Sequence, residues 1–219
     1  MKKKLFIIGV GGLTGSKLVE IAKKDFEIFG SYNYRDPKSS IQKNIKLNIS
    51  NSTKIKEILE EIKPDVVINT AGINNVDYCE KNPDLALKIN IQAVKEICQI
   101  TKKLGIKFVQ LSSDSVFDGT KQLPYEETDE PESINYYGKT KIESEKIVLE
   151  NPNNVVVRAS VLYGYLPHNL AKIESSSKKS INFGQWLINK LSINEKVRII
   201  TDEYSSPIIA DDFARSILH

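Results

Sequence analysis

The sequence has few cysteines and histidines, and it lacks long apolar runs. Among 219 residues there are two of each, and Cys79 and Cys98 stand apart without a CxxC motif. This pattern predicts neither a disulfide framework nor a metal site. No apolar run approaches the roughly 20 residues of a membrane-spanning helix, and the run after "MKKK" is too short for a signal peptide. We therefore expect a cytoplasmic protein without a metal or a membrane partner.

An excess of charge of one sign is missing as well. The 31 basic and 28 acidic residues are mixed along the chain, and the net charge is +3. Such a balance does not favour nucleic-acid binding. With 40% hydrophobic residues, the chain is long enough for one sizeable core, or for one domain with a small appended lobe.

Short apolar runs alternate with amphipathic segments along most of the chain. Such runs are typical of strands that are covered on both faces of a sheet, and they predict strands at residues 4–9, 27–32, 44–49, 65–72, 107–113, 154–161 and 197–200. Helices are predicted at residues 14–24, 52–62, 83–105 and 183–191, with Ser52 or Thr53 as a cap of the second. The polar segment 172–180 predicts a mobile loop. Alternation of strands and helices indicates an α/β fold with a doubly wound parallel sheet.

Glycines follow the first predicted strand. Gly9, Gly12 and Gly15 form a GxxGxxG pattern that opens the next helix. Glycine there lets backbone N–H groups approach a pyrophosphate at the helix N-terminus, although a tight turn would need glycine in any case. After the second strand, Arg35 suits the 2′-phosphate of NADP, whereas an exposed turn before Pro37 is the alternative.

Small and hydroxylated residues follow two further strands. Thr70, Ala71 and Gly72 end one of them and would let a flat ligand lie on the strand ends. Ser113 stands at the end of the next, where its hydroxyl can reach the same crevice. Tyr137 and Lys141 then follow at a spacing that places both on one face of a helix. That spacing by itself also fits a solvated helix turn.

Together these segments resemble the extended short-chain dehydrogenase/reductases, and within them the branch of dTDP-4-dehydrorhamnose reductases. The resemblance covers nearly the whole chain. It rests on the glycine motif and on "NTAGINNVDYCEKNPDLALKIN", "SSDSVFDGTKQLPYEE", "YYGKTKIESE", "RASVLYG" and "TDEYSSPIIADDFA". It implies a Rossmann-type domain at residues 1–159 and a small C-terminal substrate lobe at residues 160–219. This lobe is expected to be partial and interleaved with the Rossmann sheet.

The resemblance also implies the roles of the site residues. Tyr137 would protonate the oxygen of a ketone that receives a hydride, and Ser113 would hydrogen-bond that oxygen. Lys141 would lower the pKa of Tyr137, which is about 10 in a free tyrosine, and would hold the nicotinamide ribose. Asn90 would support a proton-relaying water. The remaining residues expected at the cofactor are Leu13, Asn48 and Ile49, and those expected at the substrate are Asn74 and Val161.

The expected activity is reduction of the 4-keto group of dTDP-4-dehydro-L-rhamnose to dTDP-L-rhamnose by NADPH or NADH, with NADP favoured by Arg35. The expected partners are the nucleotide sugar and, as one option, a second copy in a homodimer. Two positions depart from the branch, since Ser115 replaces a tyrosine and Val161 replaces an aromatic residue. The alternatives are a nucleotide-sugar epimerase or dehydratase, and a non-catalytic NADP-binding subunit that resembles the β subunit of methionine adenosyltransferase.

Overall fold

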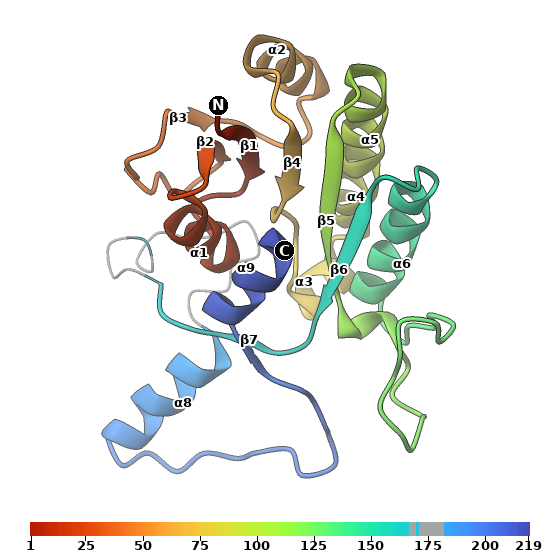
Figure 1. The fold of residues 1–219 in the computed structure, drawn as a ribbon. Helices are drawn as coiled ribbons and strands as arrows, with labels where there is room; N and C mark the ends of the chain where they lie inside the picture. The colour runs from red at the N-terminus through yellow and green to blue at the C-terminus, as the bar shows by residue number, and fades with distance from the viewer. Residues whose placement is uncertain (167–169, 171–181) are drawn as a thin grey trace.

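The centre of the molecule is a parallel sheet. The computed structural model describes residues 1–166, 170 and 182–219. Six strands are arranged in the order β3-β2-β1-β4-β5-β6, and all neighbouring strands are parallel (Figure 1). They are β1 (Lys3–Ile8), β2 (Phe26–Tyr32), β3 (Lys43–Lys46), β4 (Val66–Asn69), β5 (Lys107–Ser113) and β6 (Val155–Ala159). The predicted α/β class with a doubly wound sheet is confirmed.

Helices cover both faces of this sheet, and one further helix, α8, lies apart from it. They are α1 (Leu13–Ala22), α2 (Ser52–Ile62), α3 (Val76–Lys81), α4 (Pro83–Leu87), α5 (Ala93–Leu104), α6 (Tyr136–Leu149), α8 (Phe183–Ser192) and α9 (Ala210–Leu218). A π-helical turn, Lys88–Gln92, joins α4 to α5, and a 3-10 turn, Asp114–Val116, follows β5. The helix predicted at residues 83–105 is therefore one helical run with a π turn inside it.

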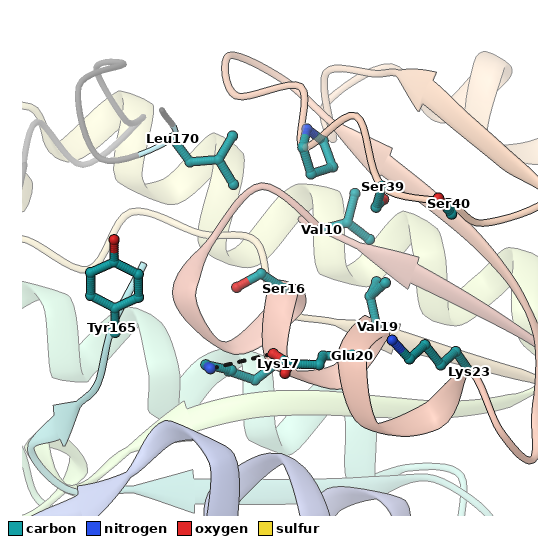
Figure 2. Close-up of a pocket in the computed structure, with 11 residues that line it drawn as sticks. Val10, Ser16, Lys17, Val19, Glu20, Lys23, Ser39, Ser40, Tyr165 and Leu170 are labelled. Atoms are coloured by element: carbon teal, nitrogen blue, oxygen red, sulfur yellow. Dashed lines mark hydrogen bonds and ion pairs between the residues drawn. The ribbon is translucent and has the colours of Figure 1, made fainter. Parts of the chain in front are cut away.

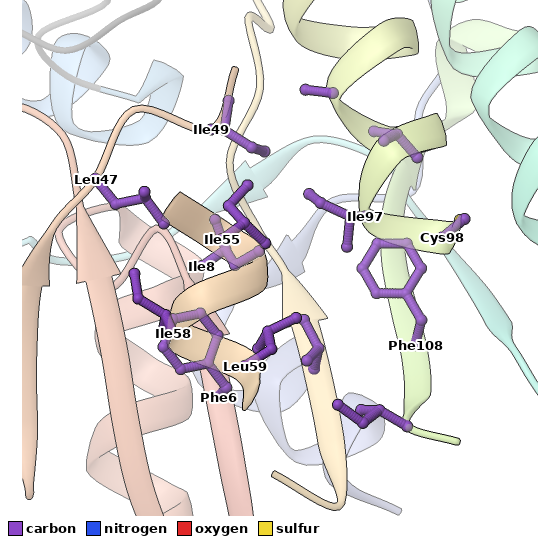
Figure 3. Close-up of a cluster of buried hydrophobic side chains, with 14 of the residues drawn as sticks. Phe6, Ile8, Leu47, Ile49, Ile55, Ile58, Leu59, Ile97, Cys98 and Phe108 are labelled. Atoms are coloured by element: carbon purple, nitrogen blue, oxygen red, sulfur yellow. The ribbon is translucent and has the colours of Figure 1, made fainter. Parts of the chain in front are cut away.

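Alternate side chains of the strands enter two apolar clusters. Phe6 of β1 and Phe108 of β5 pack with α2 and α5 on one face (Figure 3). Leu5 and Ile7 pack with α1 and α9 on the other face. Because both faces are covered, the central strands are apolar throughout rather than alternating.

The sheet order places the carboxyl ends of β1 and β4 side by side. The order reverses between these two strands, since β2 and β3 lie on one side and β5 and β6 on the other. In open α/β sheets, the crevice outside the strand ends at such a reversal is where ligands bind. The glycine-rich turn after β1 lies at this point.

Several predicted boundaries were wrong. β3 ends at Lys46, so the expected strand at residues 44–49 continues as a loop. The cap of α2 is Asn51, whose side chain accepts a hydrogen bond from the Lys54 N–H, and not Ser52 or Thr53. No strand forms at residues 197–200. The loop predicted at residues 172–180 lies outside the described residues.

The C-terminal segment is divided between the core and the surface. A second small sheet pairs β7 (Leu162–Tyr163) with β8 (Ile208–Ile209). After it, α9 packs against α1, and Lys17 of α1 lies 3.1 Å from Asp211 of α9. In contrast, α8 has no buried residue and extends away from the sheet (Figure 1). The sequence did not predict α3 or α9 as helices.

Candidate active site

The glycine-rich turn after β1 is closely packed against the end of β4. Gly9 has a φ of +96°, which favours glycine, and a Cβ there would lie 2.6 Å from the Thr70 Oγ1. That hydroxyl donates a hydrogen bond to the carbonyl of Ile8 at 2.8 Å. A Cβ on Gly15 would lie 2.2 Å from the carbonyl oxygen of Gly9. The structure therefore brings Gly9, Gly15 and Thr70 together as expected.

Gly12 has a different environment from the other glycines of this turn. It precedes Leu13, the first residue of α1, and a Cβ on it would meet only the Gly9 carbonyl oxygen, at 3.4 Å. The first N–H groups of a helix have no partner within the helix, so a ligand phosphate can approach them here. This arrangement fits the pyrophosphate of a dinucleotide.

Gly11 is a residue that the sequence-based reading missed. A Cβ on it would lie 2.1 Å from the carbonyl oxygen of Arg35, so glycine is needed for the loop after β2 to pack on the turn. The GxxGxxG pattern does not include this position. Arg35 is 8% exposed, and burial lowers the pKa of its guanidinium. Its position beside the turn fits the expected contact with the adenosine end of the cofactor.

The other expected cofactor residues follow β3 and β4. Asn48 is exposed and accepts hydrogen bonds from the N–H and hydroxyl of Ser50, whereas Ile49 packs into the core. Ala71 is half-buried. Gly72 adjoins one of the expected catalytic residues, because a Cβ on it would lie 3.8 Å from the Lys141 Nζ. These positions line the same end of the sheet.

The three expected catalytic residues meet at the end of β5. The hydroxyl of Ser113 is hydrogen-bonded to the phenol of Tyr137, in the first turn of α6. Gly138 makes this contact feasible, since a Cβ on it would lie 2.0 Å from the carbonyl oxygen of Ser115. The missing side chain lets α6 pack directly on the turn that carries Ser113.

Lys141 lies one helical turn beyond Tyr137 and is 7% exposed. Its Nζ donates a hydrogen bond to the carbonyl of Leu111 at 2.9 Å and lies 5.8 Å from the centre of the Tyr137 ring. Burial lowers the pKa of Lys141 to about 8, and the negative charge of Glu145 opposes this shift. Glu145 itself forms a two-pronged ion pair with Arg158.

The expected pKa of Tyr137 was wrong for the protein in this state. Burial raises it to about 12; the hydrogen bond with Ser113 acts in the opposite direction, and the charge of Asp114 raises it further. The expected lowering by Lys141 is not among these effects. The Lys141 ammonium bonds to the Leu111 carbonyl and lies 5.8 Å from the centre of the Tyr137 ring. Tyr137 is thus a neutral phenol at neutral pH.

Asn90 lies in the π turn and connects two segments of the site. Its Oδ1 accepts a hydrogen bond from the Ile73 N–H at 2.9 Å. Its Nδ2 donates to the Ile73 carbonyl at 2.9 Å and to the Thr140 Oγ1 at 3.1 Å. Both amide hydrogens are therefore used within the protein, and the expected support of a proton-relaying water remains a prediction. Asn90 holds the residue before Lys141 in place.

The two expected substrate residues do not contact the catalytic ones in any described interaction. Asn74 is exposed at the start of the segment before α3. Val161 is half-buried, and its carbonyl accepts a hydrogen bond from the Ile208 N–H at 3.1 Å. Their contact with a substrate remains a prediction.

A groove of about 470 Å³ runs along the outer side of α1. It lies between α1, the loop at residues 37–40, Tyr165 and Leu170 (Figure 2). Val10 of the glycine-rich turn lines it, but none of the expected catalytic residues does. The groove therefore adjoins the cofactor-binding turn and is not the reaction centre.

Two further observations concern the described residues as a whole. Among residues 1–166, 170 and 182–219, no group of three or more His, Cys, Asp or Glu side chains is placed to hold a metal ion. In the same part of the chain, no helix has both the length and the apolar character needed to cross a membrane.

Comparison with curated proteins gives relatives of three kinds. The chain is 31% identical over 215 residues to a probable low-salt glycan biosynthesis reductase, Agl14, of Haloferax volcanii, covering 97% of this chain and 69% of the relative. It is 30% identical to the dTDP-4-dehydrorhamnose reductase of Salmonella typhimurium, covering 78% and 54%. It is 31% identical to the methionine adenosyltransferase 2 subunit beta of Bos taurus, covering 84% and 56%. The chain thus spans only about half of the latter two relatives.

Among solved structures, the chain resembles a dTDP-4-dehydrorhamnose reductase from Bacillus anthracis in complex with NADP. The TM-score is 0.82 at 27% identity, and the match covers all of this chain and 70% of the other. The family described as RmlD substrate binding domain matches residues 3–219. The chain belongs to this RmlD family, whose fold is that of the extended short-chain dehydrogenase/reductases.

Proposed function

We propose that the chain is an NAD(P)-dependent reductase of a 4-keto nucleotide sugar and that its substrate is dTDP-4-dehydro-L-rhamnose. The observation that carries the proposal is the position of Tyr137. Its buried phenol is hydrogen-bonded to Ser113, with Lys141 one turn away, beside the glycine-rich turn. Tyr137 would then stand as a proton donor where a dinucleotide ends in this fold.

The chain's own residues would hold the cofactor and the reacting ketone. Gly12 and Leu13 would bind the pyrophosphate, and Thr70, Ala71 and Gly72 would border the rest of the dinucleotide. When bound, the reduced nicotinamide supplies a hydride to the ketone carbon. Lys141, fixed by the Leu111 carbonyl, would position the ribose.

Tyr137 would supply the proton that this reaction requires. A pKa of about 12 keeps the phenol protonated at neutral pH, which is the state needed to donate to a developing alkoxide. The raised pKa also means that the proton leaves only when a stronger base is formed beside it. Reduction of a ketone creates such a base.

NADP is favoured over NAD because of Arg35. An arginine after the second strand accommodates the 2′-phosphate, where NAD-specific sites carry an acidic residue. The backbone of Arg35 packs against Gly11, which keeps this residue beside the glycine-rich turn. The B. anthracis structure contains NADP.

The choice of sugar rests on the relatives. The S. typhimurium and B. anthracis proteins are dTDP-4-dehydrorhamnose reductases, whereas Agl14 is described as a glycan biosynthesis reductase. In this chain, Asn74 and Val161 would face the sugar. Valine and Ser115 offer no aromatic surface for stacking on a pyranose ring, so the reaction type is more strongly supported than the identity of the sugar.

A non-catalytic role is the second candidate, and the methionine adenosyltransferase subunit supports it at 31% identity. Such a protein would bind NADP tightly, would turn over no sugar and would co-purify with a partner enzyme. The buried Ser113–Tyr137 contact favours the reductase, because a purely structural subunit has no need of a proton donor at this point. An epimerase or dehydratase remains the third alternative.

Substitution of Tyr137 by phenylalanine tests the proposed reductase. Tyr137→Phe is expected to lower turnover by about 100-fold or more, because one positioned proton donor is lost, while NADP binding by calorimetry is unchanged. Tyr136→Phe is the matched control, since this neighbour lies in the same helix turn and has no described role. Unchanged turnover in Tyr137→Phe would refute the assignment.

A further inference from the structure

A buried carboxylate lies one helical turn beyond Lys141. Glu145 follows Lys141 by four residues in α6, a spacing that places both side chains on one face of the helix. This face packs against β5 and β6 (Figure 1), and Lys141 and Glu145 are 7% and 3% exposed. The Cβ atoms of such a pair are about 5–6 Å apart. A cation and an anion are therefore enclosed side by side.

Arg158 of β6 fixes the orientation of this carboxylate. Its Nε donates a hydrogen bond to the Glu145 Oε1 at 3.0 Å, and its Nη2 donates to the Glu145 Oε2 at 2.7 Å. Two parallel hydrogen bonds of this kind hold a planar carboxylate in one orientation. Both oxygens of Glu145 are used in this way, so Glu145 acts on Lys141 through its charge and not through a direct hydrogen bond.

Arg158 is itself held by the segment that follows β5. Its guanidinium carbon lies 5.1 Å from the centre of the Phe117 ring, and this ring stacks on Tyr125 with 4.2 Å between the ring centres. The side chain of Arg158 is 22% exposed and that of Glu145 is 4% exposed. Solvent therefore screens the charge of the guanidinium more than that of the carboxylate. For Lys141, the neighbouring ion pair thus acts mainly through its negative member.

Within the residues that the structure describes, no other carboxylate acts on the Lys141 ammonium. Apart from Glu145, the titratable group that acts on it is the thiol of Cys79 on α3. Burial raises the pKa of this thiol to about 11 and that of the nearby Tyr137 phenol to about 12, so both are neutral at neutral pH. Asp114, in the turn after β5, acts on Tyr137 and not on Lys141. From β5 itself, the ammonium meets a neutral backbone carbonyl.

Burial and the carboxylate act on Lys141 in opposite directions. Burial lowers its pKa to about 8, and Glu145 opposes this shift, so removal of the carboxylate would bring deprotonation close to neutral pH. We propose that Glu145, oriented by Arg158, keeps Lys141 in its ammonium form and that both are positioning residues for the proposed reductase. A neutral amine would lack the charge with which Lys141 is expected to hold the cofactor. The inference rests on this proposed role of Lys141.

The test is the pH dependence of unfolding, which requires neither cofactor nor substrate. Urea unfolding is measured from about pH 6 upward for each variant with Lys141 and with Lys141→Met, and the difference between the two isolates the ionisation of Lys141. With Lys141, the unfolded chain binds more protons than the folded one above about pH 8, so the free energy of unfolding rises from there. In Glu145→Gln, this rise is expected to begin about one pH unit lower.

Three further variants separate the charge of Glu145 from its packing. Glu145→Asp keeps the charge, so the rise should begin at the wild-type pH. Glu145→Met combined with Arg158→Met removes the ion pair without leaving a buried partner, and it should keep the lower onset of Glu145→Gln. Glu143→Gln is the matched control and should match the wild type, because this exposed carboxylate pairs with Lys146. A wild-type onset in both Glu145→Gln and the double variant would overturn the proposal, since the pair would then only join α6 to β6.

Cofactor binding gives a second readout. In calorimetry, the affinity of the wild type for NADP should fall as the pH rises above about 8. In Glu145→Gln the same fall should begin about one pH unit lower, and in Lys141→Met it should be absent. A shift in unfolding without a shift in NADP binding would overturn the positioning role. Wild-type protein that binds NADP but turns over no sugar would instead refute the proposed reductase, and neither of these two readouts depends on turnover.

Discussion

Replacement of Asn90 by alanine is expected to destabilise the fold more than replacement of an exposed asparagine that only caps a helix. Asn90 is 3% exposed, and its amide pairs with both backbone groups of Ile73 and with the Thr140 hydroxyl. Thr140 keeps its bond to the Tyr137 carbonyl, and the Ile73 carbonyl keeps a thiol contact with Cys79 at 3.7 Å. The Ile73 N–H loses its side-chain partner.

The magnitude follows from these contacts. An unsatisfied buried polar group costs about 1–3 kcal/mol, so loss of the partner of the Ile73 N–H gives about 2 kcal/mol. The Ile73 carbonyl adds to this cost, because the thiol that it keeps is a weak donor. Asn51→Ala is the matched control, because this exposed asparagine makes one capping bond to the Lys54 N–H. Loss of such a cap costs about 1 kcal/mol. Urea unfolding followed by circular dichroism gives both values. A cost for Asn90→Ala no larger than that for Asn51→Ala would refute the reasoning.

Three further predictions concern the cofactor end and the buried ammonium. Gly12→Ala should weaken NADP binding in calorimetry with little change in Tm, whereas Gly15→Ala should lower Tm, because its Cβ would meet the Gly9 carbonyl at 2.2 Å. Arg35→Gln should weaken binding of NADP by about tenfold or more and that of NAD little, since a charged hydrogen bond contributes about 1.5–3 kcal/mol. Burial lowers the pKa of Lys141 from 10.5 to about 8, so the unfolded chain binds more protons between these values. The free-energy cost of burying the Lys141 ammonium therefore falls as the pH rises from 8 to 10.5, so the free energy of unfolding rises over this range. In urea titrations, this rise should be absent from Lys141→Met.

The convergence of Ser113, Tyr137 and Lys141 was predicted from the family resemblance, and local rules account for part of it. Ser113 ends a strand, and a spacing of four residues places Tyr137 and Lys141 on one helix face. Parallel strands bring their carboxyl ends to one edge, so the glycine-rich turn and Ser113 had to lie near each other. Each step depends on neighbours in the sequence or on the sheet class.

The features that could not be predicted depend on contacts between distant residues. The Asn90 amide is hydrogen-bonded to Ile73 and to Thr140, which lies 50 residues further along the chain. No sequence pattern predicts these hydrogen bonds. The pKa of Tyr137 depends on how completely α3, α6 and the turn after β5 enclose it. The run at residues 197–200 has strand composition, yet Ile199 and Ile200 are exposed and no strand of the described residues pairs with it. The composition of this run favours a strand, but a strand forms only where a neighbouring strand is hydrogen-bonded to it.

The most direct test of the proposed reductase is to mix the purified chain with NADPH and dTDP-4-dehydrorhamnose and follow the absorbance of the reduced nicotinamide. We expect one NADPH to be oxidised for each dTDP-rhamnose formed, and no oxidation when either the sugar or the phenol of Tyr137 is absent. NADPH that binds, as calorimetry would show, and yet is not oxidised by this sugar would contradict the proposed activity.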